Sequence, residues 1–434
     1  MTDVPAKESG VFRVLHTADW HLGKLLGDLS REEEHERFLS FLLELIGSAE
    51  VDVLIVAGDV FDSSNPPQSA LTRYYNFLSR LSHSSACSVV VVAGNHDSPA
   101  LIEAPKQILG PLRVHVVGAV PEDTGEAVFA LPDKEAPKLA VAAIPFLRDR
   151  DVRTGQSGQS AAEIQKSLVD GIQRRYDEAA TAAAALAEQA GEKALPILAT
   201  GHLTVTGAST SDSEREIHVG GLGSFGGDRF PEAFSYVALG HLHRPQAAGG
   251  EERVRYSGSP IALSFSETKD KKAVQIIDYK GADLISSQSV LIPKERELVQ
   301  LTCSRSELEK TLQSFAPEAG GLEPWVEIVV TDPVPGENLF EVVQEAVEGR
   351  PFSVVRVVGR ASTPTALQDG EAPRQDLEDS ILDRPGEVFA FRLEQEEGLS
   401  PDEIGNLKVT FDQLIELHSE SSRESVSTTK GGAS

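Results

Sequence analysis

The sequence predicts an α/β protein in which mostly parallel strands are covered by helices. The first observation is that continuous apolar runs of strand length, such as 51–57 and 87–93, recur in the first half of the chain. The second is that segments with helical periodicity, including 30–48 and 69–81, alternate with these runs. Strands that are apolar on both faces and alternate with helices are typical of a parallel or mixed sheet buried on both sides.

The elements are expected in a regular order along the chain. The first strand is expected at 11–18 and runs into Asp19. The helix at 30–48 begins with a possible capping box of Ser30 and Glu33, and its apolar residues recur on one face. An alanine-rich segment with high helix propensity predicts another helix. This helix is expected at 160–190, and further strands are expected at 139–144, 196–200 and 236–239.

A smaller α+β domain is expected after a boundary near Pro293, because strand and helix patterns alternate again beyond it. A segment rich in Pro, Gly and Asp then predicts a linker, and two helical patterns and a polar, disordered tail follow. The expected division is a large domain at 11–292, a small domain at 296–362, a linker at 363–375, C-terminal helices at 376–418 and a tail at 419–434.

Composition points to an intracellular protein without a membrane span. The two cysteines cannot form a disulfide framework, the N-terminus lacks signal-peptide features, and no apolar run reaches the roughly 20 residues that cross a bilayer. Lys and Arg number 40 against 67 Asp and Glu, which gives a net charge of −27. This acidity argues weakly against nucleic-acid binding by the chain alone, since the C-terminal part carries much of it.

Asp, Asn and His residues follow five of the expected strands at the point where each strand ends. The carboxyl ends of strands line the ligand crevice of an open α/β sheet, so these side chains can converge. Glycine precedes four of the five sites and permits the sharp turn that takes the chain off the sheet. The five motifs are Asp19-Trp-His21, Gly58-Asp59, Gly94-Asn95-His96-Asp97, Gly201-His202 and Gly240-His241-Leu-His243.

These residue types favour a site for divalent metal ions. Carboxylate, amide oxygen and imidazole suit Mn²⁺, Fe²⁺ or Zn²⁺, and the motifs offer more ligands than one ion needs. Two metals roughly 3.5–4 Å apart and bridged by a carboxylate could clamp a phosphoryl transition state. Any one of these histidines alone is better explained by local packing. The joint pattern of five motifs favours a dinuclear centre.

The same motifs resemble those of the calcineurin-like metallophosphoesterase superfamily. Longer strings are similar to the nuclease-subunit family of SbcCD-type DNA-repair complexes over roughly 11–290. The resemblance implies a sandwich of two mixed sheets flanked by helices, with a small α+β capping domain and a C-terminal helical tail. The strings are LHTADWHLGK, IPFLRDRDV, YVALGHLHRPQ and VRYSGSPIALSFSE.

The resemblance also implies a role for each motif residue. His96 matches a histidine that is not a metal ligand and that orients or protonates the leaving oxygen, with Asp97 as its partner. Asp62 stands where archaeal and eukaryotic relatives often carry His, which leaves the role of this position open. Asp59 would bridge the metals. The first metal would be bound by Asp19, His21, Asp59 and His243, and the second by Asp59, Asn95, His202 and His241.

The family further implies a manganese-dependent nuclease that acts in DNA repair and recombination in the cytoplasm, at the nucleoid. Its expected activities are 3′→5′ exonuclease action on duplex ends and endonuclease action on single strands and hairpins. The expected partners are DNA, a second copy bound through the nuclease domain, and the ATPase SbcC in a complex with two copies of each subunit. SbcC would bind an apolar stripe in 376–418 formed by Ile404, Leu407, Phe411, Leu414 and Ile415.

Two other functions fit the same motifs less well. One is a metallophosphoesterase that acts on small phosphate esters or cyclic nucleotides. Protein phosphatases of the superfamily carry Arg shortly after the GD motif, where this chain has Asp62 and Ser63. The other is a non-catalytic scaffold on the same fold. Scaffolds lose metal ligands, whereas every expected ligand is present here.

Overall fold

The computed structural model describes residues 4–152, 160–189, 195–210, 214, 225–317, 321–334 and 336–360, together with 389, 393, 407, 408, 410 and 411. The linker expected at 363–375, the tail expected at 419–434 and most of 376–418 therefore lie outside the described residues. The chain forms two compact units. The first contains 1–147, 173–215 and 225–363, and the second contains 148–172, 216–224 and 364–434.

The first unit contains two large mixed sheets. Within the described residues, one sheet has six strands in the order β14–β13–β1–β4–β5–β6. Strands β1, β4, β5 and β6 run parallel, whereas β13 is antiparallel to both β1 and β14. Their bounds are β1 Val11–Thr17, β4 Val53–Ala57, β5 Ser88–Val92, β6 Val114–Val117, β13 Ala273–Lys280 and β14 Asp283–Leu291.

The second sheet is also mixed. Over the described part of the chain it has six strands in the order β11–β12–β10–β9–β8–β7, with parallel strands at its centre and an antiparallel strand at each edge. A short hairpin of β2 (Leu25–Leu26) and β3 (Leu29–Ser30) follows β1. The bounds in the second sheet are β7 Val128–Leu131, β8 Leu139–Ala142, β9 Ile197–His202, β10 Tyr236–Gly240, β11 Gln246–Ala248 and β12 Glu251–Tyr256.

The two sheets pack face to face because alternate residues of their strands point to opposite sides. In β4, Val53 and Ile55 belong to a buried cluster that also contains Leu198 of β9, between the sheets. Leu54 and Val56 belong to a second cluster, which contains the apolar residues of the helices on the other side. A strand that is apolar on both faces is therefore buried on both, as its sequence predicts.

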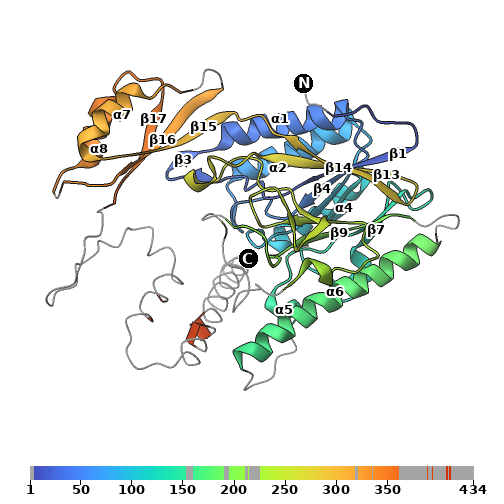
Figure 1. Cartoon of the computed structure of the whole chain (residues 1–434). Helices are drawn as coiled ribbons and strands as arrows, with labels where there is room; N and C mark the ends of the chain where they lie inside the picture. Colours follow the sequence, from blue (N-terminus) through green and yellow to red (C-terminus); the bar gives the residue numbers. More distant parts are fainter. Residues whose placement is uncertain are drawn as a thin grey trace, which may run out of the picture. The chain divides into compact units, whose positions relative to one another are not determined.

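Helices cover the outer faces of the sandwich (Figure 1). Helices α1 (Glu32–Ser48) and α2 (Gln68–Ser84) pack on the first sheet through residues such as Phe38 and Phe77. On the second sheet, the Tyr176 hydroxyl of α6 (Ala161–Gln189) donates a hydrogen bond to the Thr200 carbonyl of β9. The predicted sandwich of two mixed sheets flanked by helices is confirmed.

The predicted capping box at the start of the first helix is wrong. Helix α1 begins at Glu32, and its N-cap residue Arg31 makes no side-chain capping hydrogen bond. The guanidinium of Arg31 is buried and pairs with both carboxylate oxygens of Glu34. Ser30 instead lies in β3 and accepts a hydrogen bond from the Glu32 amide. The side chain at the N-cap position is thus engaged in an ion pair with the third residue of the helix and does not cap it.

A smaller sheet follows the sandwich. Three parallel strands are described, in the order β15–β16–β17. Helices α7 (Leu308–Ser314) and α8 (Leu339–Val347) supply buried residues to one apolar cluster with the strands. A helix in each connection is what parallel neighbours require. The strands are β15 Arg296–Cys303, β16 Leu322–Val330 and β17 Ser353–Gly359.

Short helices complete the described elements. In the second unit, the rings of Phe389 and Phe411 are stacked with their centroids 4.0 Å apart. Among the described residues, no helix is both long and apolar enough to span a membrane. The remaining helices are α3 Pro99–Glu103, α4 Lys106–Leu109, α5 Asp149–Val152, η1 Gly110–Leu112, η2 Thr124–Ala127, η3 Gly227–Arg229, η4 Phe265–Glu267 and η5 Arg305–Glu307.

Candidate metal centre

The strand register brings three of the motifs to one edge of the first sheet. Thr17 of β1 pairs with Val56 of β4, and Ala57 of β4 pairs with Val92 of β5. Asp19, Asp59 and Asn95 follow these three strand ends, so all three lie at the carboxyl edge of the sheet.

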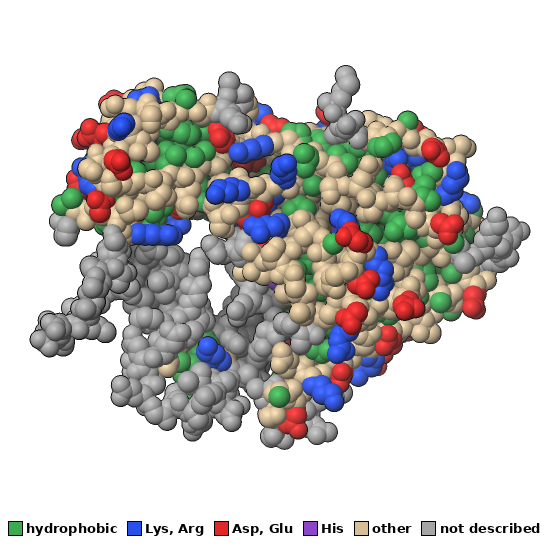
Figure 2. Space-filling model, in the orientation of Figure 1, with side chains coloured by type: hydrophobic (Ala, Val, Ile, Leu, Met, Phe, Trp, Pro, Cys, Tyr) green, Lys and Arg blue, Asp and Glu red, His purple; other side chains and the backbone are tan. Residues whose placement is uncertain are grey.

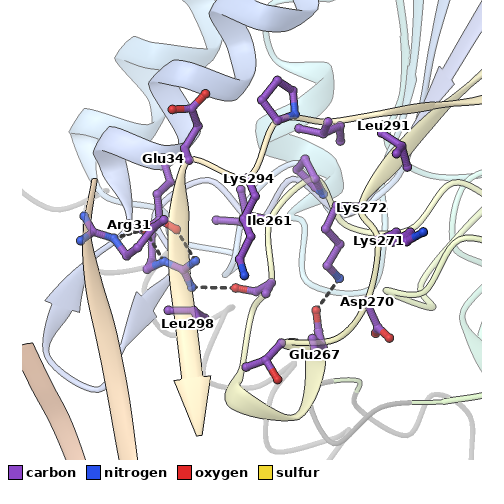
Figure 3. A pocket seen from close by; sticks show the side chains of 17 residues that line it. Arg31, Glu34, Ile261, Glu267, Asp270, Lys271, Lys272, Leu291, Lys294 and Leu298 are labelled. Carbon is purple, nitrogen blue, oxygen red and sulfur yellow. Dashed lines mark hydrogen bonds and ion pairs between the residues drawn. The ribbon is translucent and has the colours of Figure 1, made fainter. Parts of the chain in front are cut away.

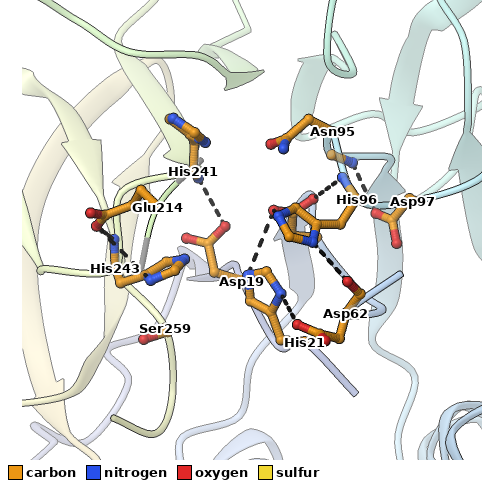
Figure 4. Close-up of polar contacts among 12 residues, drawn as sticks. Asp19, His21, Asp62, Asn95, His96, Asp97, Glu214, His241, His243 and Ser259 are labelled. Carbon is orange, nitrogen blue, oxygen red and sulfur yellow. Dashed lines mark hydrogen bonds and ion pairs between the residues drawn. The ribbon is translucent and has the colours of Figure 1, made fainter. Parts of the chain in front are cut away.

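The other two motifs come from the second sheet. His202 ends β9 and pairs with Gly240 at the end of β10, so His241 and His243 follow at the same edge. The amide of His241 donates a 2.8 Å hydrogen bond to Oδ1 of Asp19 in the first sheet. Figure 4 shows the side chains converging from both sides. The five strand ends therefore meet between two sheets rather than along the edge of one.

The backbone at these positions adopts a conformation that side chains disfavour. Asp19, His21, Asp59 and His241 have positive φ values of 53°, 45°, 48° and 99°. Non-glycine residues with positive φ are uncommon, and they cluster at functional sites where the surrounding structure holds them in place. Four of the six non-glycine residues with positive φ in the described part of the chain are thus predicted ligands.

Glycine is required at two of the motif positions for two different physical reasons. Gly58 has a φ of +91°, as the expected sharp turn requires. Gly94, which is also described, is not one of the glycines with positive φ. A Cβ at this position, however, would lie 2.1 Å from Oδ1 of Asp59. Close approach between loops, rather than backbone freedom, therefore requires Gly94.

Asp59 lies at the centre of the cluster. Its Oδ2 is 3.3 Å from Nε2 of His202, 3.6 Å from Nε2 of His21 and 4.0 Å from Nε2 of His96. Its Oδ1 accepts a 2.9 Å hydrogen bond from the amide of His96. Oδ1 of Asn95 lies 2.9 Å from Nε2 of His202. Imidazole nitrogens from two loops and from the last residue of β9 thus surround one carboxylate oxygen.

Three of the histidines are held at Nδ1. His202 Nδ1 lies 3.0 Å from the carbonyl oxygen of Ala57, and His21 Nδ1 lies 3.2 Å from Oδ1 of Asp62. His243 Nδ1 lies 3.1 Å from Oε1 of Glu267. Metal-binding histidines commonly engage a carboxylate or carbonyl through the ring nitrogen that does not bind the metal. A contact of this kind at Nδ1 makes Nε2 the candidate metal-binding nitrogen of each ring.

The contacts of His96 and Asp97 differ from those expected. Nδ1 of His96 lies 2.7 Å from the carbonyl oxygen of Asp62. The carboxylate of Asp97 accepts hydrogen bonds from the amides of Val60, Phe61 and Gly94, at 3.1, 2.9 and 2.9 Å. The resemblance implies Asp97 as the partner of His96. These contacts show that it ties the loop after β4 to the loop after β5.

Three acidic residues around the site were missed or left open by sequence reasoning. Asp62 holds His21 and also lies 3.2 Å from the ammonium group of Lys24. Glu214 accepts a 2.8 Å hydrogen bond from the amide of His243. Glu267 ends the string VRYSGSPIALSFSE that carried part of the family resemblance, which is the one signal that pointed to it.

Burial and mutual charge set the protonation of the cluster. Burial raises the pKa of Asp19 to about 7. Burial would lower the pKa of His202, but the carboxylates of Asp59 and Asp19 raise it to about 9. Burial opposes ionisation of Asp59 as well, yet the charges of His202 and His96 hold its pKa well below the usual range. Burial lowers the pKa of His21 to about 4. Asp59 is thus an anion at neutral pH.

The residues present fit divalent metal ions. Asp19 Oδ2 and His21 Nε2 are buried without a hydrogen-bond partner in the described part of the chain. Two sets of three residues, Asp19-Asp59-His202 and His21-Asp59-His96, have possible ligand atoms within 4.8 Å of one another. Buried polar groups are normally paired, so unpaired oxygen and nitrogen atoms facing one cluster are what a metal site leaves behind without its ions.

Comparison with known families agrees with this geometry. The family model described as calcineurin-like phosphoesterase matches residues 12–245. A second model, described as the type 5 capsule protein repressor C-terminal domain, matches residues 294–397. The first match covers every predicted ligand. The donor set described above, which lies within this match, suits divalent metal ions.

Relatives along most of the chain are nuclease subunits. The chain is 37% identical to the SbcD subunit of the SbcCD nuclease of Escherichia coli K12 over 386 residues, which cover 89% of this chain and 93% of that one. Identity to the SbcD subunit of Rhodobacter capsulatus is 34%, covering 84% and 91% of the two chains. Identity to that of Bacillus subtilis is 33%, covering 73% and 78%. The chain therefore belongs to the calcineurin-like phosphoesterases and, among them, to the SbcD family of SbcCD nuclease subunits.

Proposed function

We propose that the chain is the metal-dependent nuclease subunit of an SbcCD-type complex and hydrolyses phosphodiester bonds of DNA. The observation that supports this most is the buried cluster between the two sheets, where carboxylate, amide and imidazole groups surround Asp59. DNA is proposed as the substrate because the chain belongs to the SbcD family of nuclease subunits. Phosphate esters are the substrates that such a donor set, loaded with two metals, is suited to cleave.

Two Mn²⁺ ions are the proposed cofactors. Asp59 is the proposed bridge, because its Oδ2 lies within 4.0 Å of Nε2 of three histidines, which come from the ends of three different strands. Two such ions lower the pKa of water for attack and neutralise charge on the phosphoryl group. Asp19, His21, Asp59 and His243 are proposed to hold the first ion, and Asp59, Asn95, His202 and His241 the second.

His96 is proposed to protonate or orient the leaving oxygen. The carbonyl of Asp62 engages Nδ1 of its ring, and its Nε2 lies 4.0 Å from Oδ2 of Asp59, the proposed bridging carboxylate. The His96 residue is 8% exposed, more than Asp19 or His202, as a group that meets substrate should be. Asp97 is proposed to support catalysis by positioning Asp59 and His96, because its carboxylate joins the two loops that carry them.

The larger assembly is proposed from the family. The substrates would be duplex ends for 3′→5′ exonuclease action, and single strands and hairpins for endonuclease action, during repair and recombination at the nucleoid in the cytoplasm. SbcC would supply ATP hydrolysis and much of the DNA-binding surface, in a complex with two copies of each subunit. Lys and Arg side chains gather on the face in Figure 2 where the small sheet joins the sandwich, despite the net acidity of the chain.

The proposed domain division follows the sequence. The nuclease domain would span 11–292, the capping domain 296–362, the linker 363–375, the SbcC-binding helices 376–418 and the disordered tail 419–434. The nuclease domain is also proposed to pair with a second copy. Ile108, in α4, is 76% exposed, which an interface between copies would explain.

One experiment tests the proposed activity. Purified chain with Mn²⁺, alone and with SbcC and ATP, is incubated with end-labelled duplex DNA, a DNA hairpin and p-nitrophenyl phosphate esters. We expect DNA cleavage that needs Mn²⁺ and increases with SbcC and ATP. Turnover of the monoester without DNA cleavage would instead favour a phosphoesterase that acts on small substrates.

A further inference from the structure

A buried ion pair lies directly behind one of the proposed metal ligands. We propose that Glu267, held in place by Lys272, is a positioning residue that fixes the ring of His243 for metal binding. This inference rests on the proposed role of His243 as a ligand. It assigns to two residues outside the five motifs a share in building the metal centre.

Glu267 contacts the imidazole of His243 directly. It ends the short helix η4, and its side chain is fully buried. Oε1 of Glu267 lies 3.1 Å from Nδ1 of His243. A carboxylate at Nδ1 fixes both the tautomer and the ring orientation, so Nε2 is the nitrogen left for the metal. Glu267 thus serves His243 as Asp62 serves His21.

Lys272 holds the same histidine from its backbone side. Its Nζ lies 2.6 Å from Oε2 of Glu267 (Figure 3). It also donates hydrogen bonds of 2.9 Å to the carbonyl of His243 and to Oγ of Ser259. The amide of Leu263 donates to Oε2 of Glu267 at 3.1 Å. One ion pair therefore engages both the ring and the backbone of His243.

Stability alone is a poor reason for such a pair. Removing two charges from water is so unfavourable that a buried ion pair often stabilises a fold no more than well-packed apolar residues do. Glu267 is fully buried and Lys272 is 9% exposed. Positioning of His243 is a more specific reason, because a pair of apolar residues could neither engage its Nδ1 nor donate a hydrogen bond to its carbonyl.

The segment that carries Glu267 also touches the small sheet. Phe265, two residues earlier, packs with Leu298 of β15 and Trp325 of β16. Glu267 and Lys272 line a pocket of about 230 Å³ whose other walls include Arg296 and Leu298. The position of Glu267 is therefore fixed on one side by His243 and on the other by packing against the small sheet.

Metal binding by the full-length protein tests this inference. Mn²⁺ binding is measured by equilibrium dialysis and calorimetry for the wild type, Glu267→Ala, Glu267→Gln and His243→Ala. We expect Glu267→Ala to bind one of two Mn²⁺ ions about 10–100-fold more weakly, the usual effect of removing such a partner. Glu267→Gln keeps an oxygen that can accept from Nδ1–H, so it should recover most of that affinity.

Glu34→Gln is the matched control. Glu34 is also buried and pairs with two cations, Arg31 and Arg296, at the same junction. We expect this variant to melt at a lower temperature and to bind both ions as the wild type does.

Several results would overturn the inference. The first is that Glu267→Ala binds two Mn²⁺ ions with wild-type affinity. Another is equal weakening of both ions in Glu267→Ala and Glu34→Gln, which would show general destabilisation. If His243→Ala binds two ions tightly, His243 is not a metal ligand and the inference loses its basis. Wild-type protein that binds two ions without cleaving DNA would count against the proposed function alone.

Discussion

The carboxylate of Asp59 is the group that three imidazoles share, with its Oδ2 3.3–4.0 Å from their Nε2 atoms. Asp59→Asn keeps the shape of the side chain and an oxygen for the amide of His96, but it removes the negative charge. We predict that this variant loses affinity for both metal ions together, because a bridging ligand belongs to both. Metal analysis after purification in Mn²⁺ measures this.

Asp283→Asn, at an exposed position in β14, is the control for general effects of the substitution. It should retain both ions. Two ions and normal nuclease activity in Asp59→Asn would exclude Asp59 as the bridge.

His96 separates metal binding from catalysis. The proposed ligand sets are complete without it, although its Nε2 lies 4.0 Å from Oδ2 of Asp59. We predict that His96→Ala keeps both ions and binds DNA almost normally, while single-turnover cleavage slows by about 10²–10⁴-fold, as expected for a positioned general acid. His83→Ala, on the exposed surface of α2, should cleave at the wild-type rate. Loss of one ion in His96→Ala would make His96 a ligand.

Metal affinity should increase with pH between about 6 and 9. In the metal-free site the pKa of His202 is raised to about 9 and that of Asp19 to about 7. Both groups must lose their protons before they can bind a cation, so protons compete with the metal below these values. Calorimetry in buffers of different ionisation enthalpy measures the protons released. An affinity for Mn²⁺ that is constant over this range would contradict the protonation described.

At the scale of elements, most central strands of the two large sheets and the helices that cover them were predicted within about three residues of their observed bounds, whereas the parallel strands β6 and β12 were not predicted. The strand expected at 51–57 is β4 (Val53–Ala57), and the helix expected at 160–190 is α6 (Ala161–Gln189). A continuous apolar run of strand length is expected to form a buried strand, so the local sequence is enough to predict it. Strands β13 and β14 were not predicted. β13 pairs with β1, more than 250 residues earlier, and no local pattern contains that pairing.

The site was predictable to the extent that it lies at strand ends. The motif residues are next to apolar strands, so their convergence follows from the topology. The roles of Asp62, Glu214 and Glu267 were not predictable in this way, because tertiary folding brings their carboxylates to His21 and His243. For the same reason the sequence places Asp97 beside His96, whereas its carboxylate bonds to backbone amides of two loops.

The contact between the loops after β4 and β5 leads to a prediction about Gly94. A Cβ at this position would lie 2.1 Å from Oδ1 and 2.4 Å from the amide nitrogen of Asp59. We predict that Gly94→Ala lowers the free energy of unfolding by about 1–3 kcal/mol, as overpacking does, and weakens Mn²⁺ binding because Asp59 must move. Thermal melting in EDTA and metal dialysis measure the two effects.

Gly47→Ala provides the control for this substitution. Gly47 lies in α1, and a Cβ there would meet nothing within 4 Å. This variant should be neutral or more stable by up to about 1 kcal/mol, because alanine loses less conformational entropy in a helix. Equal stability of the two variants would show that the loops separate freely.

At the scale of the whole molecule, the charge is unevenly distributed along the chain. Residues 366–434 contain 16 acidic and 6 basic residues, so they carry 6 − 16 = −10 of the net −27. The metal centre adds further carboxylates, which divalent ions would neutralise. Much of the repulsion of DNA by the free chain therefore comes from a part of the sequence that holds no proposed catalytic residue, and repulsion should decrease when metals and a DNA-binding partner are present.

The last prediction separates the metal centre from partner binding. Every proposed ligand precedes Arg244, so deletion of 376–434 should leave two-ion binding and the fold of the sandwich intact. It removes the stripe that includes Leu407, which is 39% exposed, and Phe411, whose ring stacks on Phe389. An exposed apolar helix face is stabilised when a partner buries it. We therefore expect SbcC association to be lost in co-purification. Deletion of 419–434 alone should keep it, and unchanged association after the longer deletion would place the SbcC-binding surface elsewhere.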